Sequence, residues 1–419
     1  MKIIHTSDWH IGKIVNERSM IEDQEYILKQ LMEEVVTLKP DVMLIAGDIY
    51  DRSIPPIEAV ELLDHVLHTL INTHKIKVLI ISGNHDSGGR IGFGSRILRK
   101  QGLYMAGDEK TLYEKVVIDE AGECVHFYLI PYKDPAVVRK LLEDKTIRTH
   151  QEAMQAIMNE IRKEVDETVP NVVVAHGYVM QGKSESAVNP TVNKIENPIE
   201  NAIENAIAED VYTKAHLETS ESERPLAIGG TDLIDHHVFD GMDYVALGHL
   251  HGRQYVGRES IRYSGSLLRY SFSEVKQIKG ITEVDIQKDK TVTVNQHELV
   301  PKRAMRIIEG TLEELIEKGR AGGVACEDYL QAILKDEGEL ISPMDQLRAV
   351  YPNMMSLLRK QIRVIDESQT SAKSGYKTKS ELDLFGEFYE VLGQGSFDEA
   401  KKAVITEVMT QVLREESEQ

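Results

Sequence analysis

Short apolar runs alternate with helical patterns along the first hundred residues. The runs "KIIHTS", "DVMLIAG" and "KVLIIS" have the length and composition of buried β-strands. Between them, residues 20–38 and 57–71 carry apolar side chains at helical spacing, and Pro55 and Pro56 mark the start of the second helix. Strands and helices in this order form a parallel sheet with helices packed against it. The pattern therefore predicts an α/β fold.

Each predicted strand ends in a polar motif. The motifs "SDWH", "GDIYDR" and "GNHD" follow the first three strands, and two later apolar runs, "NVVVAHG" and "DYVALGHLHG", end in histidines. In α/β sheets, ligands bind just outside the carboxyl ends of the strands. We therefore expect these polar side chains to gather at one edge of the sheet and to form the functional site.

The pattern changes after Gly252 to short strands joined by turns. The segments "RQYVGRESIRYSGS" and "KGITEVDIQKDKTVTVNQHEL" are typical of β-hairpins, so this part of the chain adds antiparallel strands. We expect the main domain to cover residues 1–300. A smaller α+β unit follows over residues 301–365, with one helix begun by the capping box Thr311-x-x-Glu314 and another begun by Pro343.

Three further segments differ from the domains around them. Residues 366–380 have the composition of a linker, and residues 381–419 show two amphipathic helical stripes, which either bind a partner or pack on their own domain. Residues 183–217 contain "NKIENPIENAIENAIAED", in which isoleucine recurs every four residues and Pro198 interrupts the helical pattern. We interpret this segment as a mobile insertion with partial helix, and a docking element is the alternative.

Composition restricts the class of protein. The chain has 419 residues and a net charge of −20, and its two cysteines, Cys124 and Cys326, form no CxxC pair, which excludes a disulfide framework and a cysteine-type zinc site. Neither a signal peptide nor an apolar run of roughly 20 residues is present, so we expect a cytoplasmic protein without a membrane partner. The negative charge argues against nucleic-acid binding through the overall field. It does not exclude an enzyme that acts on DNA, because divalent metals can reverse the charge of the site or a partner can provide the DNA-binding surface.

The polar motifs supply ligands for two divalent metal ions. A single histidine after a strand is more often structural than a ligand, but the complete set of carboxylate, imidazole and amide groups after successive strands favours a metal centre. Two ions roughly 3.5–4 Å apart stabilise both the attacking and the leaving oxygen in phosphate displacement, and they need a shared carboxylate, for which Asp48 is the candidate. The predicted ligands are Asp8, His10, Asp48, Asn84, His176, His249 and His251.

Other residues of the same motifs have different predicted roles. Residues i and i+2 of an extended segment face the same way, which explains "DWH" and "HLH". We expect His85 to point over the substrate phosphate, where it stabilises developing charge or protonates the leaving oxygen. Asp51, Arg52 and Asp86 are expected to hold the loops and not to bind metal.

The ordered series D-x-H, GD-x-x-DR, GNHD, a lone histidine after a strand and GH-x-H resembles the calcineurin-like metallophosphoesterase superfamily. The strings "HTSDWHIGK", "VALGHLHGRQ", "SESERPLAIGG" and "IRYSGSLLRYSFSEVKQIKGI" resemble the SbcD family of DNA exonuclease subunits. The resemblance is strong over residues 1–284 and extends to the later regions in layout only. It fails over residues 183–217.

This resemblance implies a fold and a set of partners. The fold would be two packed mixed β-sheets flanked by helices, followed by a small capping domain that contacts DNA. The segment 381–419 would bind the coiled-coil base of SbcC, an ATPase of the SMC type, and the nuclease would be a homodimer within a heterotetramer. Asp8, His10, Asp48 and His251 would hold one manganese ion, and Asp48, Asn84, His176 and His249 the other, with His85 as the catalytic histidine that binds no metal.

The resulting hypothesis is a manganese-dependent DNA nuclease subunit that cuts duplex ends as an exonuclease and single strands or hairpins as an endonuclease. Mg²⁺, Fe²⁺ or Zn²⁺ would also suit the predicted ligands. One rival hypothesis is a phosphoesterase of the same superfamily that acts on a small molecule. A second is an inactive scaffold that recruits the ATPase, which the complete ligand set and His85 disfavour.

Overall fold

We describe the chain from a computed structural model, and the description covers residues 1–108, 110–120, 122–181, 218–223, 232–336, 338–359, 382, 385 and 401–406. The predicted insertion 183–217 and linker 366–380 lie outside the described residues, as does most of the predicted helical segment 381–419. The chain forms two compact units. The first comprises Met1–Ile307, Gly322–Gln331 and Tyr351–Ser356, and the second comprises Ile308–Ala321, Ala332–Val350 and Leu357–Gln419.

The first unit contains a six-stranded sheet with the strand order β16-β15-β1-β4-β5-β6. The strands β1, β4, β5 and β6 run parallel, as the alternation of strand and helix patterns predicts. The hairpin β15–β16 is antiparallel and joins the sheet beside β1, in agreement with the hairpin pattern late in the sequence. The strands are β1 (Lys2–Thr6), β4 (Val42–Ala46), β5 (Lys77–Ile81), β6 (Leu103–Ala106), β15 (Gly280–Ile286) and β16 (Val292–Glu298).

A second six-stranded sheet has the order β13-β14-β12-β9-β8-β7. Its four central strands, β14, β12, β9 and β8, run parallel, and the antiparallel strands β13 and β7 lie at its two edges. The strands are β7 (Glu114–Glu120), β8 (Glu123–Ile130), β9 (Asn171–His176), β12 (Tyr244–Gly248), β13 (Gln254–Val256) and β14 (Arg258–Tyr263).

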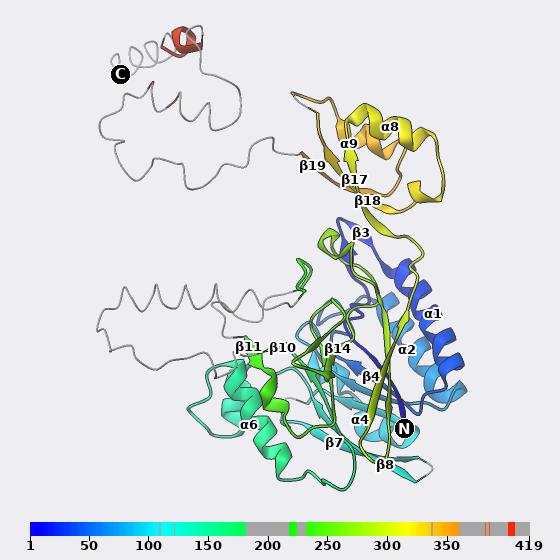
Figure 1. The fold of residues 1–419 in the computed structure, drawn as a ribbon, viewed down its shortest axis with the longest axis vertical. Coiled ribbons are helices and arrows are strands. Elements are labelled where there is room, and N and C mark those ends of the chain that lie inside the picture. Colours follow the sequence, from blue (N-terminus) through cyan, green and yellow to red (C-terminus); the bar gives the residue numbers. More distant parts are fainter. Residues whose placement is uncertain are drawn as a thin grey trace. The chain divides into compact units, whose positions relative to one another are not determined.

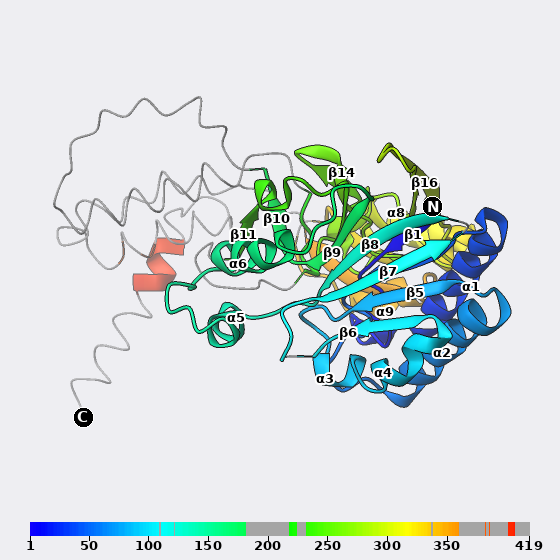
Figure 2. The same ribbon diagram turned by 90° about the horizontal axis from the view of Figure 1, so that it is seen from below.

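The two sheets enclose a shared apolar layer (Figure 2). Ile3, Leu44 and Leu79 of the first sheet belong to the same buried cluster as Phe127 and Val174 of the second. The outer face of each sheet is covered by helices, so the fold is α/β with two packed mixed sheets, as predicted. The helices are α1 (Ile21–Leu38), α2 (Ile57–His68), α3 (Gly88–Ile91) and α4 (Ser95–Leu98) beside the first sheet, and α5 (Pro135–Leu141) and α6 (His150–Arg162) beside the second.

Local sequence signals explain where these helices begin and end. Ile27, Leu31 and Val35 form the buried stripe of α1, which ends where Lys39 adopts a left-handed conformation. A capping box of Thr149 and Glu152 starts α6. The helix predicted over 57–71 is α2 to His68, followed by a π-helical turn at Thr69–Thr73, which keeps Leu70 in the core.

The remaining strands are short or belong to a small separate sheet. A three-stranded sheet, β17-β18-β19, accompanies the helices α8 and α9, and the capping box Thr311 and Glu314 starts α8 as predicted. The two compact units divide this sheet between them, and the domain boundary at residue 301 stays a prediction. These elements are β2 (Ile14–Val15), β3 (Arg18–Ser19), β10 (Tyr178–Met180), β11 (Leu233–Asp235), β17 (Met305–Gly310), α8 (Leu312–Arg320), β18 (Tyr329–Leu334), α9 (Pro343–Arg348) and β19 (Met354–Arg359) (Figure 1).

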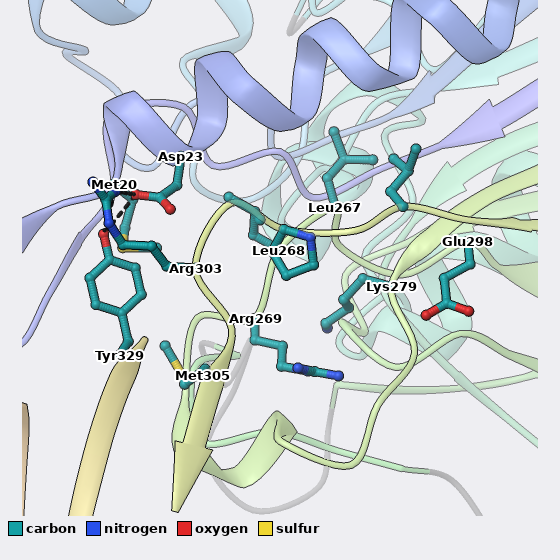
Figure 3. A pocket seen from close by; sticks show the side chains of 12 residues that line it. Met20, Asp23, Leu267, Leu268, Arg269, Lys279, Glu298, Arg303, Met305 and Tyr329 are labelled. Atoms are coloured by element: carbon teal, nitrogen blue, oxygen red, sulfur yellow. Dashed lines mark hydrogen bonds and ion pairs between the residues drawn. The ribbon is translucent and has the colours of Figure 1, made fainter. Parts of the chain in front are cut away.

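An ionic cluster in the first unit fixes the chain where it leaves the hairpin β15–β16. Arg303 and Tyr329 both point at the buried carboxylate of Asp23 on α1, at 2.8 and 2.6 Å, beside a cavity of about 40 Å³ (Figure 3). The cavity is too small for a nucleotide, so we assign it a structural role. Within the described residues, no helix is long and apolar enough to cross a membrane.

Candidate metal centre

The predicted ligands lie where the carboxyl ends of strands from both sheets meet. β1, β4 and β5 belong to the first sheet, whereas β9 and β12 belong to the second. The expectation of one edge of a single sheet is therefore wrong, because apolar runs reveal buried strands but do not reveal which sheet each strand joins. The two edges face each other, so the five polar motifs still form a single site.

One group of ligands surrounds His10. The Nε2 atoms of His10 and His251 lie 3.1 Å apart, and donor atoms of Asp8, His10 and His251 all lie within 4.8 Å of one another. All three side chains are buried. Two imidazole nitrogens facing each other beside a carboxylate form a typical site for a divalent transition metal.

A second group surrounds His176. Its Nε2 atom lies 3.5 Å from Asp48 Oδ2 and 2.9 Å from Asn84 Oδ1. The ring of His249 stacks edge-on against His176, with 5.5 Å between the ring centroids. Asp48 Oδ2 also lies 3.7 Å from His10 Nε2, so Asp48 stands between the two groups, as expected of a shared ligand.

The backbone at the site is strained. Asp8, His10, Asp48 and His249 have φ angles of 53°, 46°, 50° and 111°, a region that non-glycine residues seldom occupy. These conformations turn each chain sharply after its strand, and the turns are held by hydrogen bonds from Asp8 N to Gly47 O and from His10 N to Asp48 O. The strain therefore places the side chains at the centre of the site.

Two glycines allow the sheets to approach each other. A Cβ atom on Gly248 would lie 1.9 Å from the carbonyl oxygen of Ala46, and one on Gly47 would lie 2.4 Å from His176 Nδ1. Neither contact is sterically possible. The edges of the two sheets can meet at the site only because these positions lack side chains.

The electrostatics of the site reflect buried charge. Burial raises the pKa of Asp8 to about 8, and the negative charge of Asp48 adds to this effect. Burial disfavours a charged His176, but the carboxylates of Asp48 and Asp8 outweigh it and raise the pKa of His176 to about 9. Burial together with His176 lowers the pKa of His249 to about 3. The three shifts thus follow from burial and from the charges of neighbouring carboxylate and imidazole groups.

The donor set fits divalent metal ions. Within the described part of the chain, no lysine or arginine forms an ion pair with Asp8 or Asp48, although both are almost completely buried. Buried carboxylates require a cation, and imidazole, carboxylate and amide donors without thiolate suit Mn²⁺, Fe²⁺ or Zn²⁺. The site therefore supports the use of divalent metal.

His85 lies beside the ligands with a fixed ring. Its backbone N–H donates to Asp48 Oδ1 at 2.9 Å, and its Nδ1 lies 2.9 Å from the carbonyl oxygen of Asp51. A carbonyl oxygen can only accept, so Nδ1 carries the proton and Nε2 is directed elsewhere. The ring packs edge-on against that of His10, with the centroids 4.7 Å apart.

The three residues predicted to hold the loops differ in their contacts, and their roles stay predictions. Asp86 accepts hydrogen bonds from the backbone of Ile49, Tyr50 and Gly83, and burial raises its pKa to about 7. Asp51 pairs with Lys13 at 2.7 Å, although its Oδ1 atom also lies 3.7 Å from His10 Nδ1. Arg52 is mostly exposed and lies 3.7 Å from Asp51.

Sequence reasoning missed the groups that surround His251. Glu274 and Ser222 contact its Nδ1 atom at 3.1 and 2.7 Å, Glu223 accepts from its N–H, and Lys279 donates to its carbonyl oxygen. These residues follow no strand end and no metal-binding motif. The strings "SESERPLAIGG" and "IRYSGSLLRYSFSEVKQIKGI" contain all four residues, but this resemblance assigns none of them a role.

The fold and site define a calcineurin-like metallophosphoesterase. Residues 1–253 match the calcineurin-like phosphoesterase family, and residues 301–391 match the type 5 capsule protein repressor C-terminal domain, SbcD_C. The chain is 30% identical over 416 residues to the SbcD component of the nuclease SbcCD from Staphylococcus epidermidis, and the match covers 99% of this chain and 100% of that protein. The chain thus belongs to the SbcD family, as the sequence motifs predict, and it is a metal-dependent phosphodiesterase or nuclease.

We predict that Asp48→Ala loses metal, because it removes the carboxylate that lies between the two ligand groups. Metal analysis after dialysis should find about two ions per wild-type chain and fewer than one in the variant. Asp64→Ala, which removes an exposed carboxylate on α2, should keep both ions. Two ions bound to a folded Asp48→Ala protein would contradict the shared-ligand role, and Asp48→Asn, which preserves side-chain volume, repeats the test if the first variant does not fold.

Proposed function

We propose that this chain is the manganese-dependent nuclease subunit of a complex with an SbcC-type ATPase. It would hydrolyse DNA phosphodiesters as an exonuclease on duplex ends and as an endonuclease on single strands and hairpins. The observation that carries the proposal is that the seven predicted ligands and His85 come together at one place, in a chain similar over its whole length to an SbcD nuclease subunit. An enzyme that acts on cellular DNA would work in the cytoplasm.

Each ion would have four protein ligands. Asp8, His10, Asp48 and His251 would hold one, and Asp48, Asn84, His176 and His249 the other. The distances within the two ligand groups and the position of Asp48 between them support this division. When bound, such ions polarise the phosphoryl oxygens and lower the pKa of a bound water.

His85 would act on the substrate directly. The hydrogen bond from its Nδ1 to the carbonyl of Asp51 fixes the ring and leaves Nε2 as the reactive nitrogen. Protonated at Nε2, the ring can donate to a phosphate oxygen or give its proton to the leaving 3′ or 5′ oxygen. Because the backbone N–H of His85 donates to Asp48, the ring is held beside the proposed metal ligands.

The apolar surface of the first unit supports a homodimer. Ile54 and Ile57 at the start of α2 are 69% and 73% exposed, and Phe93 and Ile97 around α4 are 83% and 78% exposed. We call these four residues the apolar patch. α2 and α4 both lie on the helical side of β5 and β6 (Figure 2). Large exposed apolar side chains favour a protein interface, and a second copy would cover them within the proposed heterotetramer.

The C-terminal segment is the proposed site for the ATPase. Most of residues 381–419 lies outside the described residues, so the proposal depends on the two amphipathic stripes in the sequence and on the similarity to a component of SbcCD. An amphipathic helix binds a partner through its apolar face. The base of a coiled coil offers a groove of that kind.

We predict that His85→Gln loses nuclease activity and retains both metal ions, since it removes the proton donor without touching a ligand. With Mn²⁺ and end-labelled linear duplex DNA, its cleavage rate should fall by about 10²–10⁴-fold. Bis-p-nitrophenyl phosphate is assayed in parallel. If the wild-type chain hydrolyses this small ester but leaves DNA intact, even with the ATPase added, the small-molecule phosphoesterase is the better hypothesis.

We predict that truncation before residue 381 abolishes binding of the ATPase and leaves nuclease activity of the isolated chain unchanged, because the metal centre lies wholly within the first unit. Co-expression with the tagged ATPase and affinity purification measures binding, and DNA cleavage with Mn²⁺ serves as the control for folding. Recovery of the truncated chain with the ATPase would show that the binding surface lies elsewhere.

We predict that Phe93→Glu together with Ile97→Glu converts a dimer to a monomer, since charges would have to be buried at the interface. Light scattering on a size-exclusion column should give about 95 kDa for the wild-type chain, which is twice the 47.3 kDa of one copy, and half of that for the variant. The matched control is Val117→Glu, which places the same charge at an exposed position of β7. An unchanged mass would eliminate the apolar patch as the interface.

A further inference from the structure

Neighbouring side chains hold both the backbone and the ring of His251, which is one of the predicted metal ligands. Glu223 Oε1 accepts from its backbone N–H at 2.8 Å, and Lys279 Nζ donates to its carbonyl oxygen at 2.9 Å. Its Nδ1 atom lies 3.1 Å from Glu274 Oε1 and 2.7 Å from Ser222 Oγ, while Nε2 faces His10. The backbone and the ring are therefore both fixed by neighbouring side chains.

Glu274 is the central residue of this network. It ends a 3₁₀ turn, Phe272–Glu274, and is completely buried. Its Oε1 atom accepts from Ser220 and Ser222, and its Oε2 atom lies 2.6 Å from Lys279 Nζ. A buried carboxylate is stable only when it is paired, so the geometry keeps Glu274 ionised and paired with Lys279.

The pairing determines which nitrogen of His251 carries the proton. An ionised carboxylate only accepts hydrogen bonds, and Glu274 Oε1 lies 3.1 Å from His251 Nδ1. The Nδ1 atom of His251 must therefore donate, and in the neutral ring the lone pair is then on Nε2. This is the nitrogen that faces His10 in the metal centre.

We propose that Glu274 is a positioning residue for metal binding: together with Lys279 it holds His251 in the tautomer whose Nε2 is free to bind metal. Both residues lie in the string "IRYSGSLLRYSFSEVKQIKGI", which resembles the SbcD family, but the sequence assigned neither of them a role. The inference depends on the proposed metal centre. It states that Glu274 strengthens metal binding at one of the two ion sites. His10 provides a contrast, because its Nδ1 has no hydrogen-bond partner among the described residues.

The tautomer is tested first in the metal-free full-length chain, which requires no activity. Long-range ¹H–¹⁵N correlation of histidine-labelled protein distinguishes the two tautomers, and His251 is assigned by the loss of its signals in His251→Gln. We expect the Nδ1–H form in the wild-type chain and a detectable Nε2–H form in Glu274→Gln, whose amide can donate to Nδ1. An Nε2–H form in the wild-type chain would overturn the proposal.

Metal affinity is tested by calorimetric titration with Mn²⁺ alone. We expect two ions per wild-type chain, with one site weakened by about 10–100-fold in Glu274→Gln and the other unchanged. Glu283→Gln is the matched control, because Glu283 contacts His297 at 2.9 Å and Lys2 at 3.2 Å in a similar trio outside the metal centre. If the wild-type chain binds two ions and Glu274→Gln binds both with unchanged affinity, the proposed role of Glu274 is wrong. The proposed metal centre would still stand.

Two further results separate the possible failures. If the wild-type chain binds no Mn²⁺, the proposed metal centre is wrong, whatever the tautomer of His251. If Glu274→Gln does not fold, the double variant Glu274→Leu with Lys279→Met removes both buried charges together, which proteins often tolerate. A folded double variant that keeps the Nδ1–H tautomer and full affinity at both sites would equally overturn the proposal.

Discussion

Buried negative charge is the constraint on which the rest of this structure depends. Asp8 and Asp48 lie almost completely out of solvent, and in the described part of the chain only histidine side chains come close enough to pair with them. Removing two carboxylates from water is expensive unless cations replace the solvent. Divalent ions supply that charge, and they also reverse the direction in which burial shifts the pKa of a carboxylate. The site is therefore incomplete as a purely protein structure.

Placing so many donors around one point demands an unusual backbone. Four of the site residues occupy the left-handed region, and Gly47 and Gly248 permit contacts that any side chain would block. Each strained residue costs of order 1–3 kcal/mol, so the surrounding structure must hold it. The two sheets do so: they share an apolar layer and carry helices on their outer faces, so β1, β4, β9 and β12 are packed on both sides.

The sequence predicted the parallel strands, both hairpins and the residues that converge on the site, because local periodicity and polar strand ends are short-range signals. It did not predict that the site joins two sheets, since strand pairing depends on contacts far apart in the chain. Glu274 and Lys279 were missed for the same reason: Ser222 lies 52 residues from Glu274, and His251 lies 28 residues from Lys279. Whether the seven donors bind metal as assigned stays a prediction.

The network behind His251 also solves an electrostatic problem. Lys279 holds the carbonyl of His251, which brings a buried ammonium close to a centre designed for cations. Unpaired, that charge would repel a metal ion and would itself be unstable. Glu274 cancels it at 2.6 Å and uses its other oxygen to orient the imidazole. The charges of Glu274 and Lys279 therefore cancel at the distance of the metal ion, while their hydrogen bonds still fix the orientation of His251. The protein can hold this ligand in place without weakening the attraction of the carboxylates for metal.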